Sequence, residues 1–123
     1  MKTILLIERE SEQQTACQSG LEASGYRVVL ASNSREVIRV FGIEKPDLAI
    51  VSPHPLRAEQ LQALQAIKTI DESLPIIIYS RHSLFGDDFR YWLADCVISS
   101  GSNLDVLKEK VSVLLNEGSR TPF

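Results

Sequence analysis

Five short apolar runs alternate with segments of helical spacing, and this alternation limits the fold more than any other feature of the sequence. In most runs the apolar residues are consecutive, which is typical of parallel strands covered on both faces. Strands that alternate with helices predict right-handed crossovers and a doubly wound α/β sheet. The five runs are Thr3–Ile7, Arg27–Ala31, Leu48–Val51, Ile76–Tyr79 and Cys96–Ile98.

Helix signals lie between these runs. Ser11 with Gln14 has capping-box spacing, and Gly25 is a suitable residue to end that helix. Asn33-Ser34 with Glu36 predicts the start of a second helix, which must end before Pro46. The apolar stripes expected to face the sheet are Val37, Ile38 and Phe41 in the second helix; Ala58, Leu61, Leu64 and Ile67 in the third; and Leu104, Leu107, Val111 and Leu114 in the last.

The composition is that of one ordinary soluble domain: 123 residues, of which 44% are hydrophobic and 24% charged. A net charge of −3 gives no general attraction for nucleic acid or anionic membrane. No apolar run approaches the ~18 residues that span a bilayer. The two cysteines lack metal-binding spacing. We therefore expect a cytoplasmic protein with a domain at residues 1–117 and a flexible tail at 118–123.

The residues that follow the predicted strands are candidates for a site. In an open parallel sheet, ligands bind beyond the carboxyl ends of the strands, where the strand order reverses. The candidate polar side chains follow the first, third, fourth and fifth runs. They are Glu8, Arg9 and Glu10 after the first; Ser52 and His54 after the third; Ser80, Arg81 and His82 after the fourth; and Ser99 and Ser100 after the fifth.

The order and spacing of these segments, from about residue 2 to residue 115, resemble the receiver domain of bacterial response regulators. Pro46–Ser52 is similar to that family's third strand and Pro75–Ser80 to its fourth, and Ala94-Asp95 looks like the Gly-Ala-Asp before its fifth. The resemblance implies a flavodoxin-like three-layer sandwich with a five-stranded parallel sheet of order 2-1-3-4-5. It also implies about five helices, the fourth short or irregular, and a role in two-component signal transduction or a phosphorelay.

The resemblance also implies a role for each position of the site. The position of the aspartate that accepts the phosphoryl group is occupied by Ser52. The remaining equivalents are Glu8 and Arg9 for the magnesium-binding acids, with Glu10 beside them; Ser80 for the switch hydroxyl; Ser100 for the conserved lysine; and Val97 for the aromatic residue that reports activation.

These replacements remove groups that the family's chemistry requires, namely a carboxylate nucleophile, acids for magnesium and an ammonium group. A serine hydroxyl is a poor nucleophile unless a base activates it. Arg9 in place of an acid should weaken magnesium binding, or abolish it, because a unit charge near a dication is worth several kcal/mol at about 4 Å. We expect no cofactor and no enzyme activity. Arg9 is expected to occupy the metal's place, pair with Glu8 or Glu10, and donate hydrogen bonds to Ser52.

The segment between Ser80 and Ser100 holds the candidate partner surface. Gly86 disfavours a continuous helix there, so we expect an irregular loop and then a short helix from about Asp88. Receivers contact partners through helix four, strand five and helix five. We therefore expect signalling by phosphorylation-independent contact with a protein partner, with a homodimer as a further candidate and no binding of nucleic acid or membrane. The aromatic residues of this surface are Phe85, Phe89, Tyr91 and Trp92.

Two alternatives stay open. In the first, the chain is a non-standard receiver that still accepts a phosphoryl group, with metal held by Glu8 and Glu10. In the second, the same edge of the sheet is a small metal-binding or ligand-binding module, in which His54 and His82 with Glu8 hold a transition metal.

Overall fold

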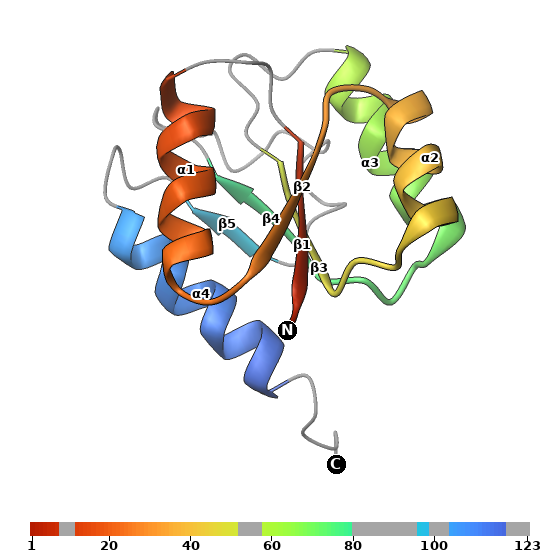
Figure 1. Cartoon of the computed structure of the whole chain (residues 1–123). Helices are drawn as coiled ribbons and strands as arrows, with labels where there is room; N and C mark the ends of the chain where they lie inside the picture. Colours follow the sequence, from red (N-terminus) through yellow and green to blue (C-terminus); the bar gives the residue numbers. More distant parts are fainter. Residues whose placement is uncertain (8–11, 52–57, 80–95, 99–103, 118–123) are drawn as a thin grey trace.

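All five predicted strands form, with the predicted bounds, in one parallel sheet (Figure 1). The structure is a computed structural model that describes residues 1–7, 12–51, 58–79, 96–98 and 104–117. The strands are β1 (Thr3–Ile7), β2 (Arg27–Ala31), β3 (Leu48–Val51), β4 (Ile76–Tyr79) and β5 (Cys96–Ile98).

Four helices lie within the described residues. They are α1 (Glu12–Ala23), α2 (Ser34–Ile43), α3 (Ala58–Ile70) and α4 (Leu104–Glu117). The short helix predicted from about Asp88, the cap predicted at Ser11 and the tail at 118–123 lie outside the described residues.

The strand order is β2-β1-β3-β4-β5, which confirms the predicted flavodoxin-like topology. The chain moves from β1 outward to β2 and then crosses back over β1 to β3, so the order reverses at β1 and β3. Ile7 pairs in register with Ala31 on one side and with Val51 on the other. The carboxyl ends of these three strands are therefore level with one another.

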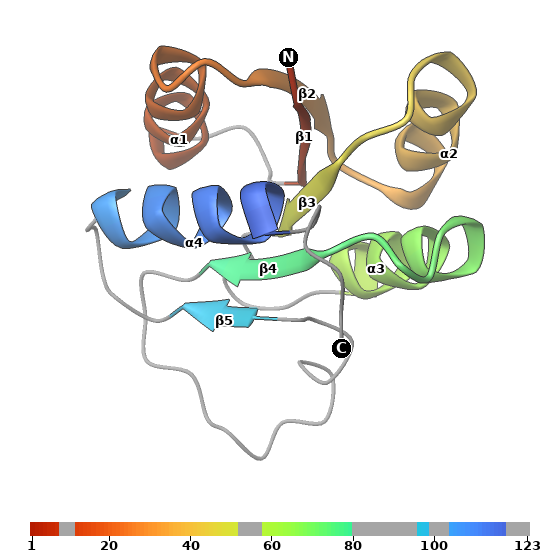
Figure 2. The same ribbon diagram turned by 90° about the horizontal axis from the view of Figure 1, so that it is seen from below.

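Two helices cover each face of the sheet. Figure 2 shows α1 and α4 on one face and α2 and α3 on the other. Leu5 and Ile7 of β1 pack in the cluster with α2 and α3, whereas Ile4 and Leu6 pack in the cluster with α1 and α4. All four side chains are fully buried, and burial stabilises each by about 1.5–3 kcal/mol. Coverage of both faces is the physical reason for the consecutive apolar residues.

The turn between α1 and β2 depends on one glycine. Gly25 has a φ of 97°, a left-handed conformation that a residue with a Cβ adopts only at a cost. The N–H groups of Ser24, Gly25 and Tyr26 donate to carbonyls of the last turn of α1. Gly25 therefore ends α1 and directs the chain into β2, as the sequence predicts.

Helix α2 begins as predicted but faces the sheet differently. The Asn33 side chain caps it by accepting a 2.9 Å hydrogen bond from the N–H of Glu36. Val37 is fully buried, but Ile38 is 57% exposed, so its predicted place in the core is wrong. Val40 is buried instead. Positions 37, 40 and 41 form one stripe at helical spacing, and Ile38 lies about 100° round the helix from Val37.

Helix α4 follows its predicted pattern with one shift. Leu107 and Val111 are fully buried, as expected, and Leu115 rather than Leu114 completes the stripe. Leu104 and Leu114 pack half-buried at the margin of the same cluster. In α3, Leu64 and Ile67 are buried as predicted and Leu61 is half-buried, while Ala63 is an additional core residue.

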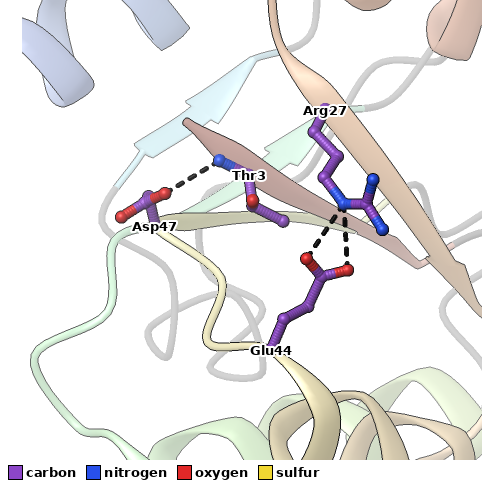
Figure 3. A network of polar contacts seen from close by, with 4 residues as sticks. All are labelled: Thr3, Arg27, Glu44 and Asp47. Atoms are coloured by element: carbon purple, nitrogen blue, oxygen red, sulfur yellow. Dashed lines mark hydrogen bonds and ion pairs between the residues drawn. The ribbon is translucent and has the colours of Figure 1, made fainter. Parts of the chain in front are cut away.

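Polar contacts join the amino ends of the strands (Figure 3). The N–H of Thr3 donates to Asp47 Oδ2 at 2.8 Å, and the N–H of Asp47 donates back to the carbonyl of Thr3 at 2.8 Å. Arg27 Nε donates to both carboxylate oxygens of Glu44, at 2.9 and 3.1 Å. These contacts hold the starts of β1, β2 and β3 beside one another, at the edge opposite to the predicted site.

Candidate functional site

The carboxyl ends of β1, β3, β4 and β5 lie along one edge of the sheet. Ile7 pairs with Val51, and Val51 pairs with Ile78. Tyr79 pairs with Ile98. The residues that come next in the sequence are Glu8, Ser52, Ser80 and Ser99. The topology therefore sets the ends of these four strands side by side, and the ends of β1 and β3 lie at the point where the strand order reverses.

Of the predicted site residues, Val97 alone lies within the described part of the chain. It is the central residue of β5 and pairs in register with Ile78 of β4. The other predicted positions lie outside the described residues, and so does the predicted partner surface. They are Glu8, Arg9, Glu10, Ser52, His54, Ser80, His82 and Ser100 in the site, and Phe85, Phe89, Tyr91 and Trp92 in the surface.

A polar corner at the same edge escaped the sequence analysis. Ser32 follows β2, whose last residue is level with Ile7. The Glu36 carboxylate accepts hydrogen bonds from the Ser32 N–H at 2.6 Å and from the Ser32 hydroxyl at 2.8 Å. The sequence contains a signal for this corner, because Ser32 directly follows the second apolar run and Glu36 lies four residues after Ser32.

The corner holds its carboxylate in the ionised form. The hydrogen bond from the backbone of Ser32 is the main cause that lowers the pKa of Glu36, followed by the bond from the Ser32 hydroxyl, and Arg39 contributes through its charge. Partial burial acts in the opposite direction but is the weaker effect. Because one Oε of Glu36 accepts two hydrogen bonds, the carboxylate is fixed in place at this end of the sheet.

Comparisons with known proteins agree on the kind of domain, although no protein-family model matches the sequence. The transcriptional regulatory protein PhoP for alkaline phosphatase synthesis, from Bacillus subtilis, is 29% identical over 77 residues, which are 63% of this chain. The transcriptional regulatory protein ZraR from Klebsiella oxytoca is 28% identical over 80 residues, or 65% of the chain. The response regulator TrrA from Thermotoga maritima, solved with magnesium and beryllofluoride, superposes with a TM-score of 0.80 at 29% identity over 94% of this chain and all of TrrA.

The chain has the fold of response regulator receiver domains and resembles response regulators in sequence.

The matched segments span 32% of PhoP and 18% of ZraR, so the chain corresponds to much less than the whole of either regulator. TrrA has also been solved in complex with the histidine kinase ThkA, and in that complex TrrA superposes with a TM-score of 0.79 over 94% of this chain. The partner of that receiver is thus a protein of a signalling pathway.

Within the described part of the chain, His, Cys, Asp and Glu side chains form no group of three or more that is placed to hold a metal ion. None of the helices described is long and apolar enough to cross a membrane.

Proposed function

We propose that this receiver domain signals by protein–protein contact without accepting a phosphoryl group. The observation that carries the proposal is the residue after β3. Val51 is the fully buried last residue of that strand and is level with Ile7 of β1, and the next residue is Ser52 rather than an aspartate. In this proposal Ser52 takes the family's phosphoacceptor position, so a hydroxyl replaces the carboxylate.

The neighbouring replacements support the same function. A receiver concentrates carboxylates so that magnesium can bind and an acyl phosphate can form. Here Arg9 offsets the charge of Glu8, and Ser100 brings a hydroxyl in place of an ammonium group. At an effective dielectric near 20, one unit charge about 4 Å away is worth about 4 kcal/mol against each unit of the dication's charge. We propose that magnesium binds weakly or not at all, and that the chain is not an enzyme.

Arg9 has a further role in this proposal. A guanidinium group supplies positive charge in a fixed planar geometry and several hydrogen-bond donors. We propose that Arg9 takes the place of the metal, pairs with Glu8 or Glu10, and donates to Ser52. The edge of the sheet would then hold one conformation without a ligand.

The proposed partner is a protein of a signalling pathway in the cytoplasm. It would bind the face formed by β5, α4 and the segment that carries Phe85, Phe89, Tyr91 and Trp92. On α4, which belongs to this face, Val113 is 41% exposed. The same face would serve a homodimer.

A comparison with a repaired site tests the proposal. Arg9→Asp, Ser52→Asp and Ser100→Lys together restore the family's groups. Amide chemical shifts are recorded for both proteins with magnesium and beryllofluoride, with Ile7, Val51 and Tyr79 as reporters next to the site. The repaired protein should show shifts at these three reporters, and the wild-type protein should show none.

Thr3, which begins β1 at the opposite edge of the sheet, serves as a remote control in both proteins. Wild-type shifts that require beryllofluoride, or an acid-labile phosphorylated form made with acetyl phosphate, would contradict the proposal in favour of the phosphorylatable receiver. Wild-type shifts with a transition metal alone, which disappear when His54 and His82 are replaced by alanine, would favour the metal-binding module.

A further inference from the structure

The outward face of α2 has an unusual composition. Helix positions spaced i, i+3, i+4, i+7 and i+8 lie on one face of a helix. In α2 the five residues with this spacing are all exposed to solvent, and every other residue of the helix is buried or half-buried. We call these five residues the α2 face. They are Arg35, Ile38, Arg39, Gly42 and Ile43.

The apolar part of the α2 face is formed by two isoleucines. Ile38 is 57% exposed and Ile43 is 77% exposed. The outward face of a surface helix is ordinarily polar, and exposed apolar side chains that gather on one element mark interaction sites. Gly42 lies between them on the same face, and a Cβ added at Gly42 would meet no atom within 4 Å. Another backbone can therefore approach the helix closely there.

The charged part of the face is wholly basic. Nearby cations elsewhere are paired, because Arg27 contacts Glu44 at 2.9 Å and Lys45 lies 3.8 Å from Asp71. Arg35 forms no ion pair with any residue that the structure describes, and Arg39 acts on Glu36 through its charge without an ion-pair contact. Two adjacent guanidinium groups thus face solvent on a chain whose net charge is −3. Arginine is also the cation best suited to bidentate contact with carboxylates.

We propose that the α2 face binds an acidic amphipathic helix of another protein. Its carboxylates would pair with Arg35 and Arg39, and its apolar side chains would pack on Ile38 and Ile43. A helix fits because the five residues run along the α2 axis, and the open space over Gly42 suits the 8–10 Å separation of packed helices. This surface does not depend on the chemistry proposed for the edge of the sheet.

The probe is a synthetic helical peptide that carries Glu and Leu on one face. It is titrated into the isotope-labelled full chain, and amide shifts report both the site and the Kd. Binding should shift the amides of α2 and weaken as salt rises, because the screening length falls from about 10 Å at 0.1 M to about 3 Å at 1 M. A peptide with Gln in place of Glu should bind more weakly.

The decisive variant is Arg35→Glu with Arg39→Glu. Its matched control is Lys2→Glu with Lys110→Glu, which changes the net charge by the same amount at exposed positions outside α2. The first should weaken binding about tenfold or more, because like charges then face each other, while the control should keep its Kd within about twofold. Ile38→Ser should also weaken binding. Thermal melts verify that each variant folds.

Several results would overturn the proposal. Equal weakening by both charge variants would show general attraction between opposite charges. Shifts centred away from α2, or no binding at about 1 mM peptide, would remove the surface. Binding to anionic phosphatidylserine vesicles without binding to the peptide would assign the face to a membrane instead of a protein.

Discussion

Replacing Asp47 with alanine should destabilise the domain far more than replacing Glu44, although both residues hold the same edge of the sheet (Figure 3). The acceptor lost in Asp47→Ala serves the N–H of Thr3, a residue that is only 7% exposed. The acceptor lost in Glu44→Ala serves the side chain of Arg27, which is 60% exposed. Water can replace Glu44 as the partner of Arg27, but it has little access to the Thr3 donor.

The expected magnitudes follow from this difference. A hydrogen bond to a charged group contributes about 1.5–3 kcal/mol, and a buried donor left without an acceptor loses that contribution in full. We expect a cost of about 2 kcal/mol for Asp47→Ala. Asp47→Asn keeps an acceptor oxygen without the charge and should cost about 1 kcal/mol. Glu44→Ala breaks a solvent-exposed ion pair and should cost about 0–1 kcal/mol.

Urea unfolding followed by circular dichroism measures all three variants, and an unchanged m-value confirms that the unfolded state is comparable. The effect of Glu44→Ala should shrink in 0.5 M salt, because salt screens exposed pairs, whereas that of Asp47→Ala should persist. Costs for Asp47→Ala and Glu44→Ala that agree within about 0.5 kcal/mol would refute the argument that access of water to the donor sets the difference.

Three further predictions concern the described residues. The pKa of Glu36 lies below its ordinary value of 4.5 because its carboxylate accepts hydrogen bonds from Ser32. The ionised carboxylate therefore stabilises the fold fully above pH 4.5, and this stabilisation is lost as the pH falls through the lower pKa of the folded state. Glu36→Gln should reduce the loss of stability on acidification, as measured by urea unfolding at several pH values. Gly25→Ala should destabilise the fold by about 1–2 kcal/mol because φ is 97° at this residue. Gly42→Ala should stabilise the fold by up to about 1 kcal/mol because Gly42 lies in a helix with open space around it. Thermal melts that show both variants stabilised, or both destabilised, would contradict this reasoning. Leu64→Ala should destabilise the fold by about 2–5 kcal/mol because it leaves a cavity in the core. Ile38→Ala, at an exposed position, should destabilise it by about 0.5 kcal/mol or less. Chemical denaturation of the two variants measures the difference between their free energies of unfolding.

The sequence by itself determined the elements and their order. Consecutive apolar residues such as those of Thr3–Ile7 favour a strand covered on both faces, and the five apolar runs predicted all five strands with their bounds. The cap at Asn33 and the left-handed turn at Gly25 were equally readable, because each depends on the local chemistry of one residue. The position of Ser52 at the strand end follows from the same local pattern.

Tertiary structure alone decided how α2 is rotated on the sheet and which polar groups meet. Ile38 and Val40 are both β-branched apolar residues in the middle of α2, and only contact with the sheet buries Val40 and leaves Ile38 exposed. Thr3 and Asp47 are 44 residues apart, so no local pattern predicts that one donates to the other. A pattern of spacing fixes the angle between residues on one helix, but the rotation of that helix on the sheet is set by packing against elements distant in the sequence.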